Sequence, residues 1–137
     1  MDVLSRSQLA EAALVNIETL RYYERRGLIP APPRSAANYR RYPARTVDRV
    51  RFVKHAQDLG FSLEEIKELL SLRATRGAKA GDVKKRAEKK IVEVADRIRA
   101  LEAIRTALQF LVSQCSGEGP IEECSILHAI ESHGDPQ

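Results

Sequence analysis

The sequence predicts a mainly α-helical protein in which several short helices precede one long helix and a short C-terminal loop and helix. Residues 83–112 contain neither Gly nor Pro, and their apolar residues recur every three or four positions, which predicts one continuous helix. Its expected length of about 45 Å, at about 1.5 Å per residue, exceeds the core of a small domain. We therefore expect a second copy of the chain to cover the apolar stripe, giving a coiled-coil homodimer.

Two short helices are predicted near the N-terminus, over residues 7–13 and from Asn16 to about Arg26. Asn16 is a suitable N-cap, and Gly27 can end the second helix in the left-handed conformation. Two helices joined by a tight turn have the form of a helix-turn-helix, whose second helix enters the major groove of DNA. The exposed residues predicted to contact DNA from this helix are Asn16, Thr19, Arg21 and Tyr22.

A small hairpin, or wing, is predicted next. Leu28–Pro30 and residues 39–42 read as two short strands around a Pro-rich break. Cationic and aromatic side chains on such a wing can contact the phosphate backbone. The side chains of this kind in the wing are Arg34, Tyr39, Arg40 and Arg41.

Two further helices are predicted before the long one. The first runs from Thr46 to about Leu59 and carries basic residues on its outer face, among them Lys54. The second begins at Ser62, which can form a capping box with Glu65. A polar turn then leads to the long helix.

Charge and composition narrow the classes of function. The net charge is +4, and residues 1–60 hold 11 Lys and Arg against 6 Asp and Glu, so a nucleic-acid contact is favoured there. The sequence has no run of 18 apolar residues and no signal-peptide pattern, and we therefore expect a cytoplasmic protein. It also has no nucleophile–base constellation and no phosphate-binding loop, which argues against an enzyme.

Cys115 and Cys124 enclose a Gly- and Pro-containing loop directly after the long helix, and residues 125–130 read as a short amphipathic helix. In a reducing compartment two cysteines favour metal binding or redox chemistry over a structural disulfide. Two thiolates on one loop can bind a soft ion such as Cu(I), Ag(I), Au(I), Hg(II) or Zn(II). A buried cysteine pair and a redox dithiol are alternatives. His128 and His133 are further candidate ligands, although His128 fits a packing or surface role better.

Three segments together resemble the MerR family of transcriptional regulators: LRYYERRGLI (residues 20–29), NYRRY (38–42) and LGFSLEEI (59–66). The resemblance implies an N-terminal winged helix-turn-helix, a linking helix pair, a long antiparallel coiled-coil dimerisation helix, and a short C-terminal metal-binding loop and helix. The corresponding parts are a DNA-binding domain with its linking helices over 1–73, a dimerisation helix over 80–113, and a metal-binding segment over 114–137.

The resemblance also implies roles for particular residues. The implied DNA contacts are Arg21, Tyr22, Arg34, Tyr39, Arg40 and Lys54. Two positions depart from the family pattern, because Leu14 and Asn38 stand where the family usually has Gly; Asn tolerates a positive φ better than Leu does. In the implied mechanism the dimer represses a promoter without metal, and with metal it distorts the DNA so that RNA polymerase can engage.

The cysteine loop resembles the metal-sensing branch of that family. Ala80 occupies the position where mercury, zinc and lead sensors have a cysteine and copper-type sensors a serine. Because Ala cannot bind a metal, we expect a linear two-thiolate site for Cu(I), Ag(I), Au(I) or Hg(II), with Lys84 of the partner offsetting the negative charge. The eight residues between the cysteines instead match the divalent sensors. A Zn, Pb or Cd sensor, a redox-responsive regulator and, from a different class, a small metal-trafficking protein are therefore alternatives.

Overall fold

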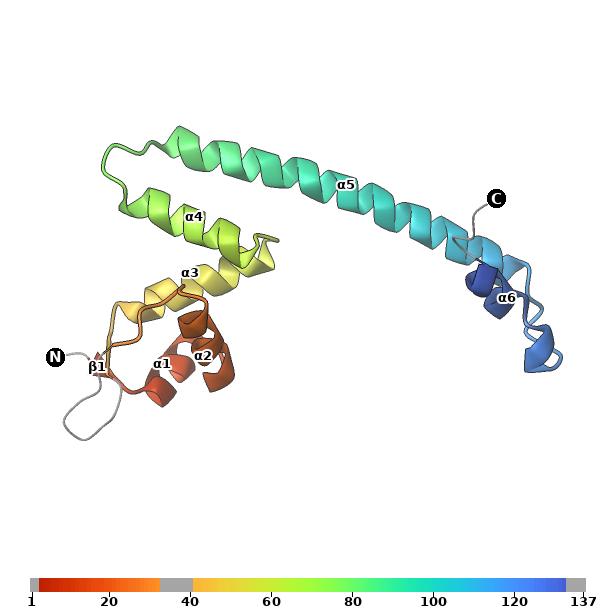
Figure 1. The fold of residues 1–137 in the computed structure, drawn as a ribbon, viewed down its shortest axis with the longest axis horizontal. Helices are drawn as coiled ribbons and strands as arrows, with labels where there is room; N and C mark the ends of the chain where they lie inside the picture. The colour runs from red at the N-terminus through yellow and green to blue at the C-terminus, as the bar shows by residue number, and fades with distance from the viewer. Residues whose placement is uncertain (1–2, 33–40, 133–137) are drawn as a thin grey trace. The chain divides into compact units, whose positions relative to one another are not determined.

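The computed structural model describes residues 3–32 and 41–132, and the chain divides into two compact units, Met1–Lys90 and Ile91–Gln137 (Figure 1). The described residues confirm the predicted, mainly helical fold. Their α-helices are α1 (Arg6–Ala13), α2 (Ile17–Arg25), α3 (Thr46–Asp58), α4 (Leu63–Ala74), α5 (Ala80–Ser113) and α6 (Ser125–Ser132). A 3-10 helix, η1 (Ile121–Glu123), and two short strands, β1 (Val3–Leu4) and β2 (Tyr42–Pro43), complete the described elements.

Local capping signals set the starts of several helices. Ser5 begins α1 with a capping box, in which its Oγ accepts from the Gln8 N–H at 3.1 Å and its own N–H donates to Gln8 Oε1 at 2.8 Å. The predicted capping box of α4 is confirmed with the same pair of distances between Ser62 and Glu65. Each box satisfies two backbone N–H groups that the first turn of a helix leaves unpaired.

The core of the first unit lies where α1 packs against α2 and α3, and α3 against α4. Its fully buried side chains come from the helices and from the segments that join them. They are Leu9, Leu20, Leu28, Tyr42, Val50, Val53 and Ile66, each with 0% exposure. Tyr23 is 2% exposed and also belongs to the core.

The predicted strand at Leu28–Pro30 is wrong, although Leu28 and Ile29 are buried. The backbone of Leu28 is already used, because its N–H donates to the Tyr23 carbonyl at 2.9 Å and its carbonyl accepts from Arg49 Nε at 2.7 Å. Instead β2 pairs antiparallel with β1, with Leu4 opposite Tyr42. Part of the predicted returning strand, residues 39–40, lies outside the described residues.

Ion pairs connect the first part of α5 to α4 within the first unit. Lys90 Nζ lies 2.8 Å from Glu65 Oε1 and 5.5 Å from the centre of the Phe61 ring. Arg86 Nη1 lies 2.6 Å from Glu68 Oε1. The hydrogen bond from Lys90 favours the charged form of Glu65 and lowers the pKa of that carboxyl group. These contacts tie the start of α5 to the helix that precedes it.

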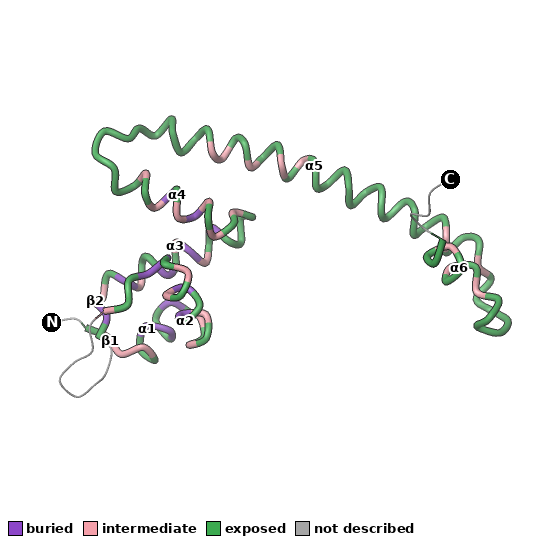
Figure 2. Tube along the Cα trace, in the orientation of Figure 1, coloured by how far each residue is buried: buried purple, intermediate pink, exposed green. Residues whose placement is uncertain are grey.

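None of the α5 side chains is buried, as Figure 2 shows along the helix. The predicted apolar stripe is exposed, from Ile91 at 66% through Ile98 at 50% to Leu108 at 50%. An apolar face of this length on a single chain is the surface that a coiled-coil partner would cover. None of the described helices combines the length and the apolar composition that crossing a membrane requires.

Leu14 holds an unusual conformation at the end of α1. Its φ of 59° and ψ of 42° lie in the left-handed region, and it is the one described non-Gly residue with a positive φ. The turn needs this conformation, because the Val15 N–H then reaches the Ala10 carbonyl at 3.0 Å. The side chain is 75% exposed, so little packing offsets the strain.

We predict that Leu14→Gly raises the free energy of unfolding by up to about 1 kcal/mol. Removing Cβ relieves roughly 1–2 kcal/mol of left-handed strain, and the added freedom of the unfolded chain cancels about half of that gain. Urea denaturation at matched protein concentrations measures the change. Leu59→Gly is the control, because Leu59 is 69% exposed with a φ of −83° and should lose stability. Equal losses in both variants would contradict the assigned strain.

Candidate DNA-contact surface and cysteine loop

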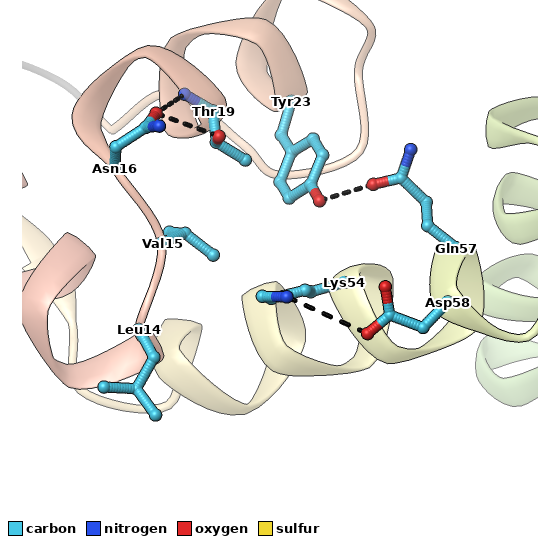
Figure 3. Close-up of a pocket in the computed structure, with 8 residues that line it drawn as sticks. All are labelled: Leu14, Val15, Asn16, Thr19, Tyr23, Lys54, Gln57 and Asp58. Carbon is cyan, nitrogen blue, oxygen red and sulfur yellow. Dashed lines mark hydrogen bonds and ion pairs between the residues drawn. The ribbon is translucent and has the colours of Figure 1, made fainter.

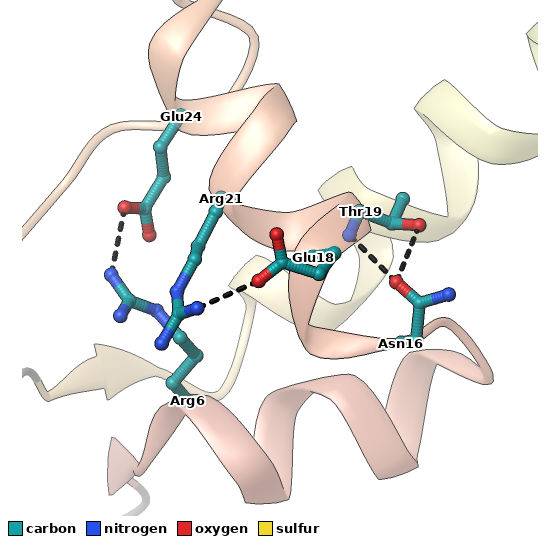
Figure 4. Close-up of polar contacts among 6 residues, drawn as sticks. All are labelled: Arg6, Asn16, Glu18, Thr19, Arg21 and Glu24. Carbon is teal, nitrogen blue, oxygen red and sulfur yellow. Dashed lines mark hydrogen bonds and ion pairs between the residues drawn. The ribbon is translucent and has the colours of Figure 1, made fainter.

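The start of α2 presents two of the predicted DNA-contact residues as one polar unit. Asn16 Oδ1 accepts from the Thr19 N–H at 2.8 Å and from Thr19 Oγ1 at 2.9 Å (Figure 4). The amide oxygen therefore caps the helix, as predicted, while the amide nitrogen points away from Thr19. Asn16 can thus donate to an acceptor outside the protein without giving up its cap.

Arg21 and Tyr22 lie on the exposed side of α2. Arg21 Nη1 lies 2.7 Å from Glu18 Oε1, and both side chains are exposed, so this ion pair contributes little to stability and can be exchanged for a phosphate or a base edge. The hydroxyl of Tyr22 accepts from Arg26 Nη1 at 3.1 Å. The guanidinium groups of Arg25 and Arg26 each lie 5.8 Å from the centre of the Tyr22 ring. Sequence reasoning missed these two arginines, although their i+3 and i+4 spacing from Tyr22 is the signal for such contacts.

Lys54 of α3 shares an open hollow with the start of α2 (Figure 3). Its Nζ lies 3.8 Å from Asp58 Oδ2, and the side chain is partly exposed. The hollow is lined by Leu14, Val15, Asn16, Thr19, Tyr23, Lys54, Gln57 and Asp58. Three predicted DNA-contact residues from two helices, Asn16, Thr19 and Lys54, therefore border one surface.

Two buried tyrosines fix the helices behind this surface. Tyr23 Oη donates to Gln57 Oε1 at 2.6 Å, which joins α2 to α3, and burial raises the pKa of Tyr23. Arg6 Nη2 donates to Glu24 Oε1 at 3.1 Å (Figure 4). Tyr42 Oη donates to the other carboxylate oxygen, Glu24 Oε2. Burial, followed by the bond to Glu24, raises the pKa of Tyr42. The carboxylate of α2 is thus held by α1 on one side and β2 on the other.

The other predicted DNA contacts belong to the wing. Arg34, Tyr39 and Arg40 lie outside the described residues, as does Asn38. Arg41, also predicted on the wing, is described and exposed directly before β2. The wing contacts therefore stay predictions.

The two cysteines lie at opposite ends of the C-terminal loop, and both are free thiols of intermediate burial. Cys115 follows the end of α5, where its N–H donates to the Val112 carbonyl at 3.1 Å, and its Sγ accepts from the Gly117 N–H at 3.4 Å. Cys124 caps α6, since its carbonyl accepts from the His128 N–H at 3.2 Å.

In the described part of the loop, Cys115 and Cys124 supply the thiol donors. Among the described residues no group of three or more His, Cys, Asp or Glu side chains gathers in a way that could hold a metal ion. His128 uses its ring in the protein, because Nε2 lies 3.0 Å from the Glu122 carbonyl oxygen. His133 lies outside the described residues. Two thiolates fit a soft ion that accepts linear coordination.

Ala80 and Lys84 lie in the first turns of α5, and both are exposed. Their predicted role requires the loop of a second chain, so it stays a prediction.

Sequence and structure comparisons with known proteins all match this chain to MerR-type or metal-resistance transcriptional regulators. Residues 4–72 match the sequence model of the MerR HTH family regulatory protein, and residues 47–111 match that of MerR, DNA binding. The mercuric resistance operon regulatory protein of Serratia marcescens is 39% identical over 128 residues, which cover 93% of this chain and 88% of the relative. The protein of the same name from Bacillus cereus is 41% identical over 123 residues, covering 90% and 93%. The crystal structure of the transcription regulator PbrR691 from Ralstonia metallidurans CH34 in complex with lead(II) has 29% identity and a TM-score of 0.79, covering 93% of this chain and 98% of that one.

We predict opposite effects on DNA affinity from the two members of the Arg21–Glu18 pair. Arg21→Gln should weaken binding at least about tenfold, because a charged contact to DNA is lost. Glu18→Gln should strengthen binding a few-fold at low salt, since it frees the arginine and removes a negative charge. Fluorescence anisotropy with a duplex selected from a random-sequence library measures both. A loss of affinity in Glu18→Gln as large as in Arg21→Gln would mean that the pair acts only inside the protein.

Proposed function

Because the chain belongs to the MerR family, we propose that it is a metal-responsive transcriptional regulator that binds promoter DNA as a homodimer. In this proposal Cys115 and Cys124 hold a soft ion, Hg(II) or one of Cu(I), Ag(I) and Au(I). The dimer represses without the ion and activates with it by distorting the promoter, so that RNA polymerase can engage both of its elements. A cytoplasmic, non-enzymatic role is part of the same proposal.

The surface formed by α2 and α3 supports the DNA-binding part. The side-chain oxygen of Asn16 caps α2 by accepting hydrogen bonds from Thr19, while its amide nitrogen stays available to donate to DNA. The charged members of the surface, Arg21 and Lys54, are in exposed pairs that DNA phosphates can replace. Behind them, the partly buried contacts of Tyr23 and Glu24 hold α2 in place, so binding does not have to order the helix.

The apolar stripe of α5 supports the homodimer. Toward the end of the helix it forms a hollow lined by Leu101, Ile104, Arg105, Leu108, Gln109, Val112 and Ser113. Apolar side chains of a second α5 can fill such a hollow in the manner of a coiled coil. One continuous helix, α5, connects the cysteine loop to the ion pairs that Lys90 and Arg86 make with α4. In the proposed dimer a conformational change of the loop on metal binding would act on α4 through this helix.

The two free thiols and the names of the relatives support metal sensing. Two compared relatives are regulators of mercuric resistance operons, and Hg(II) suits a two-thiolate site. Ala80 offers no third ligand at the start of α5. The second candidate is a divalent Pb, Zn or Cd sensor, favoured by the lead(II) complex of the compared structure. A redox-responsive regulator that uses the same thiols is a further alternative; a metal-trafficking protein is disfavoured by the family.

We predict that Cys115→Ser and Cys124→Ser each weaken Hg(II) binding at least about 100-fold, because each removes one of two ligands. Competition with a thiol chelator on the reduced dimer measures the affinity, and a promoter fusion measures the loss of induction. Ser125→Ala, exposed and next to Cys124, is the matched control and should behave as wild type. Full retention of binding and induction in either cysteine variant would refute the two-thiol site. Tighter binding of Zn(II) or Pb(II) than of Hg(II) would favour the divalent alternative.

We predict that Leu108→Glu weakens dimerisation by roughly a thousandfold or more. Two copies of the substitution enter each dimer, and losing a buried leucine removes at least about 2 kcal/mol per copy, with 1.4 kcal/mol for each factor of ten. Analytical ultracentrifugation measures the monomer–dimer equilibrium. Ala103→Glu is the control, because the helical period places Ala103 on the face of α5 opposite the stripe. An unchanged dimer in Leu108→Glu would argue against α5 as the dimer contact.

A further inference from the structure

We propose that His128 is a positioning residue of the cysteine loop: its ring holds the turn before Cys124 in the shape that binds the metal. The inference deepens the proposed function and rests on it for the identity of the ligand. It also assigns a role to the one described histidine of this segment that differs from metal ligation.

The ring of His128 makes a specific contact with the loop backbone. Its Nε2 lies 3.0 Å from the carbonyl oxygen of Glu122. A carbonyl oxygen only accepts, so Nε2 must carry the proton and donate it. Glu122 is the middle residue of η1, and η1 directly precedes Cys124. The contact therefore joins α6 to the turn on the far side of the cysteine.

Cys124 lies between two groups of hydrogen bonds. On its N-terminal side its own N–H donates to the Ile121 carbonyl at 3.1 Å, and the Glu123 N–H donates to the Pro120 carbonyl at 3.0 Å. On its C-terminal side its carbonyl accepts from the His128 N–H at 3.2 Å. His128 takes part on both sides, through its backbone to Cys124 and through its ring to Glu122. The residue thus closes a ring of hydrogen bonds around the backbone of Cys124.

The glycines in the rest of the loop explain why the hydrogen bond from His128 to Glu122 would affect metal binding. Gly117 and Gly119 have φ values of 83° and 92°, so the loop uses conformations that glycine alone adopts easily. Glycine also gives the loop many alternative conformations, and ordering them opposes metal binding. Cys115 is attached to the end of α5, whereas Cys124 depends on η1 and α6. A side chain that fixes η1 against α6 reduces the conformational entropy that the loop loses when both thiols bind one ion.

The alternative role of His128 is that of a third ligand. Against this role, the described residues hold no cluster of three or more His, Cys, Asp or Glu side chains that could bind a metal ion. The bond from Nε2 to the Glu122 carbonyl leaves Nδ1 as the ring nitrogen with a lone pair, so a ligand role would have to use Nδ1. A positioning role and a ligand role respond differently to glutamine. The Gln amide nitrogen can donate to Glu122 from nearly the place of His Nε2, but a glutamine is a poor ligand for a soft ion.

The test compares His128→Ala with His128→Gln in the full-length reduced dimer, with Hg(II) as the probe and a thiol chelator as the competitor. We expect His128→Ala to weaken Hg(II) binding about 3- to 10-fold, the effect of one exposed hydrogen bond, and His128→Gln to stay within about twofold of wild type. Glu131→Gln, later in α6 and exposed, is the control and should bind as wild type. Equal losses in the two His128 variants would assign a ligand role and overturn the proposal, as would no loss in His128→Ala.

A second measurement needs no metal. Amide hydrogen exchange of Glu123 and Cys124 in the metal-free protein should accelerate several-fold in His128→Ala and remain near the wild-type rate in His128→Gln. If the wild-type protein fails to bind Hg(II), the proposed function fails for that ion, while the exchange rates still decide whether His128 orders the turn. Unchanged exchange in His128→Ala would overturn the positioning role whatever the ion.

Discussion

The apolar stripe of α5 is not covered by the described residues of its own chain, and this constraint determines how the rest of the protein can work. The helix buries none of its residues, and within its own chain it is held mainly by backbone hydrogen bonds and by the ion pairs at its start. Its stability in solution must therefore come from a second surface, and in the proposed dimer that surface is another α5. Metal binding and DNA binding then become properties of a pair of chains. The reason is that α5 forms the proposed dimer contact, leads directly into the cysteine loop and is attached to α4.

The polar contacts of the first unit fall into two kinds with different consequences. Those of Glu24 and Tyr23 are partly buried and connect separate elements, so they fix the backbone of α2. Those of Arg21 and Lys54 are exposed and connect neighbours on one helix, so they are weak and can be exchanged. A surface built in this way is rigid in its backbone and adaptable in its charged groups. This combination suits contacts to phosphates, where register is set by the fold and individual ion pairs form on binding.

Local signals in the sequence predicted much of the fold. The capping box of Ser62, the cap at Asn16, the left-handed Gly27 and the long period of α5 depend on neighbours within a few residues, and the structure confirms them. The error at Leu28 arose because apolar strand-like residues can also be buried in a helix-terminating turn. The pairing of β1 with β2 joins residues some 40 positions apart, and no local pattern encodes it. The same applies to the contact of Lys90 with Glu65. The two thiols of the cysteine loop are evident from the sequence, whereas the contact of the His128 ring with the Glu122 carbonyl depends on the fold.

The side chain of Glu65 takes part both in a local helix cap and in a contact with a residue far along the chain. Its Oε1 accepts from the Ser62 N–H at 2.8 Å, which begins α4, and the same oxygen lies 2.8 Å from Lys90 Nζ, which anchors α5. Glutamine would keep the cap but lose the charge that attracts Lys90, and aspartate would keep the charge but is one methylene shorter. Two separate contacts therefore limit which residues can replace Glu65. A single substitution at this position can weaken both the cap of α4 and the ion pair that holds α5.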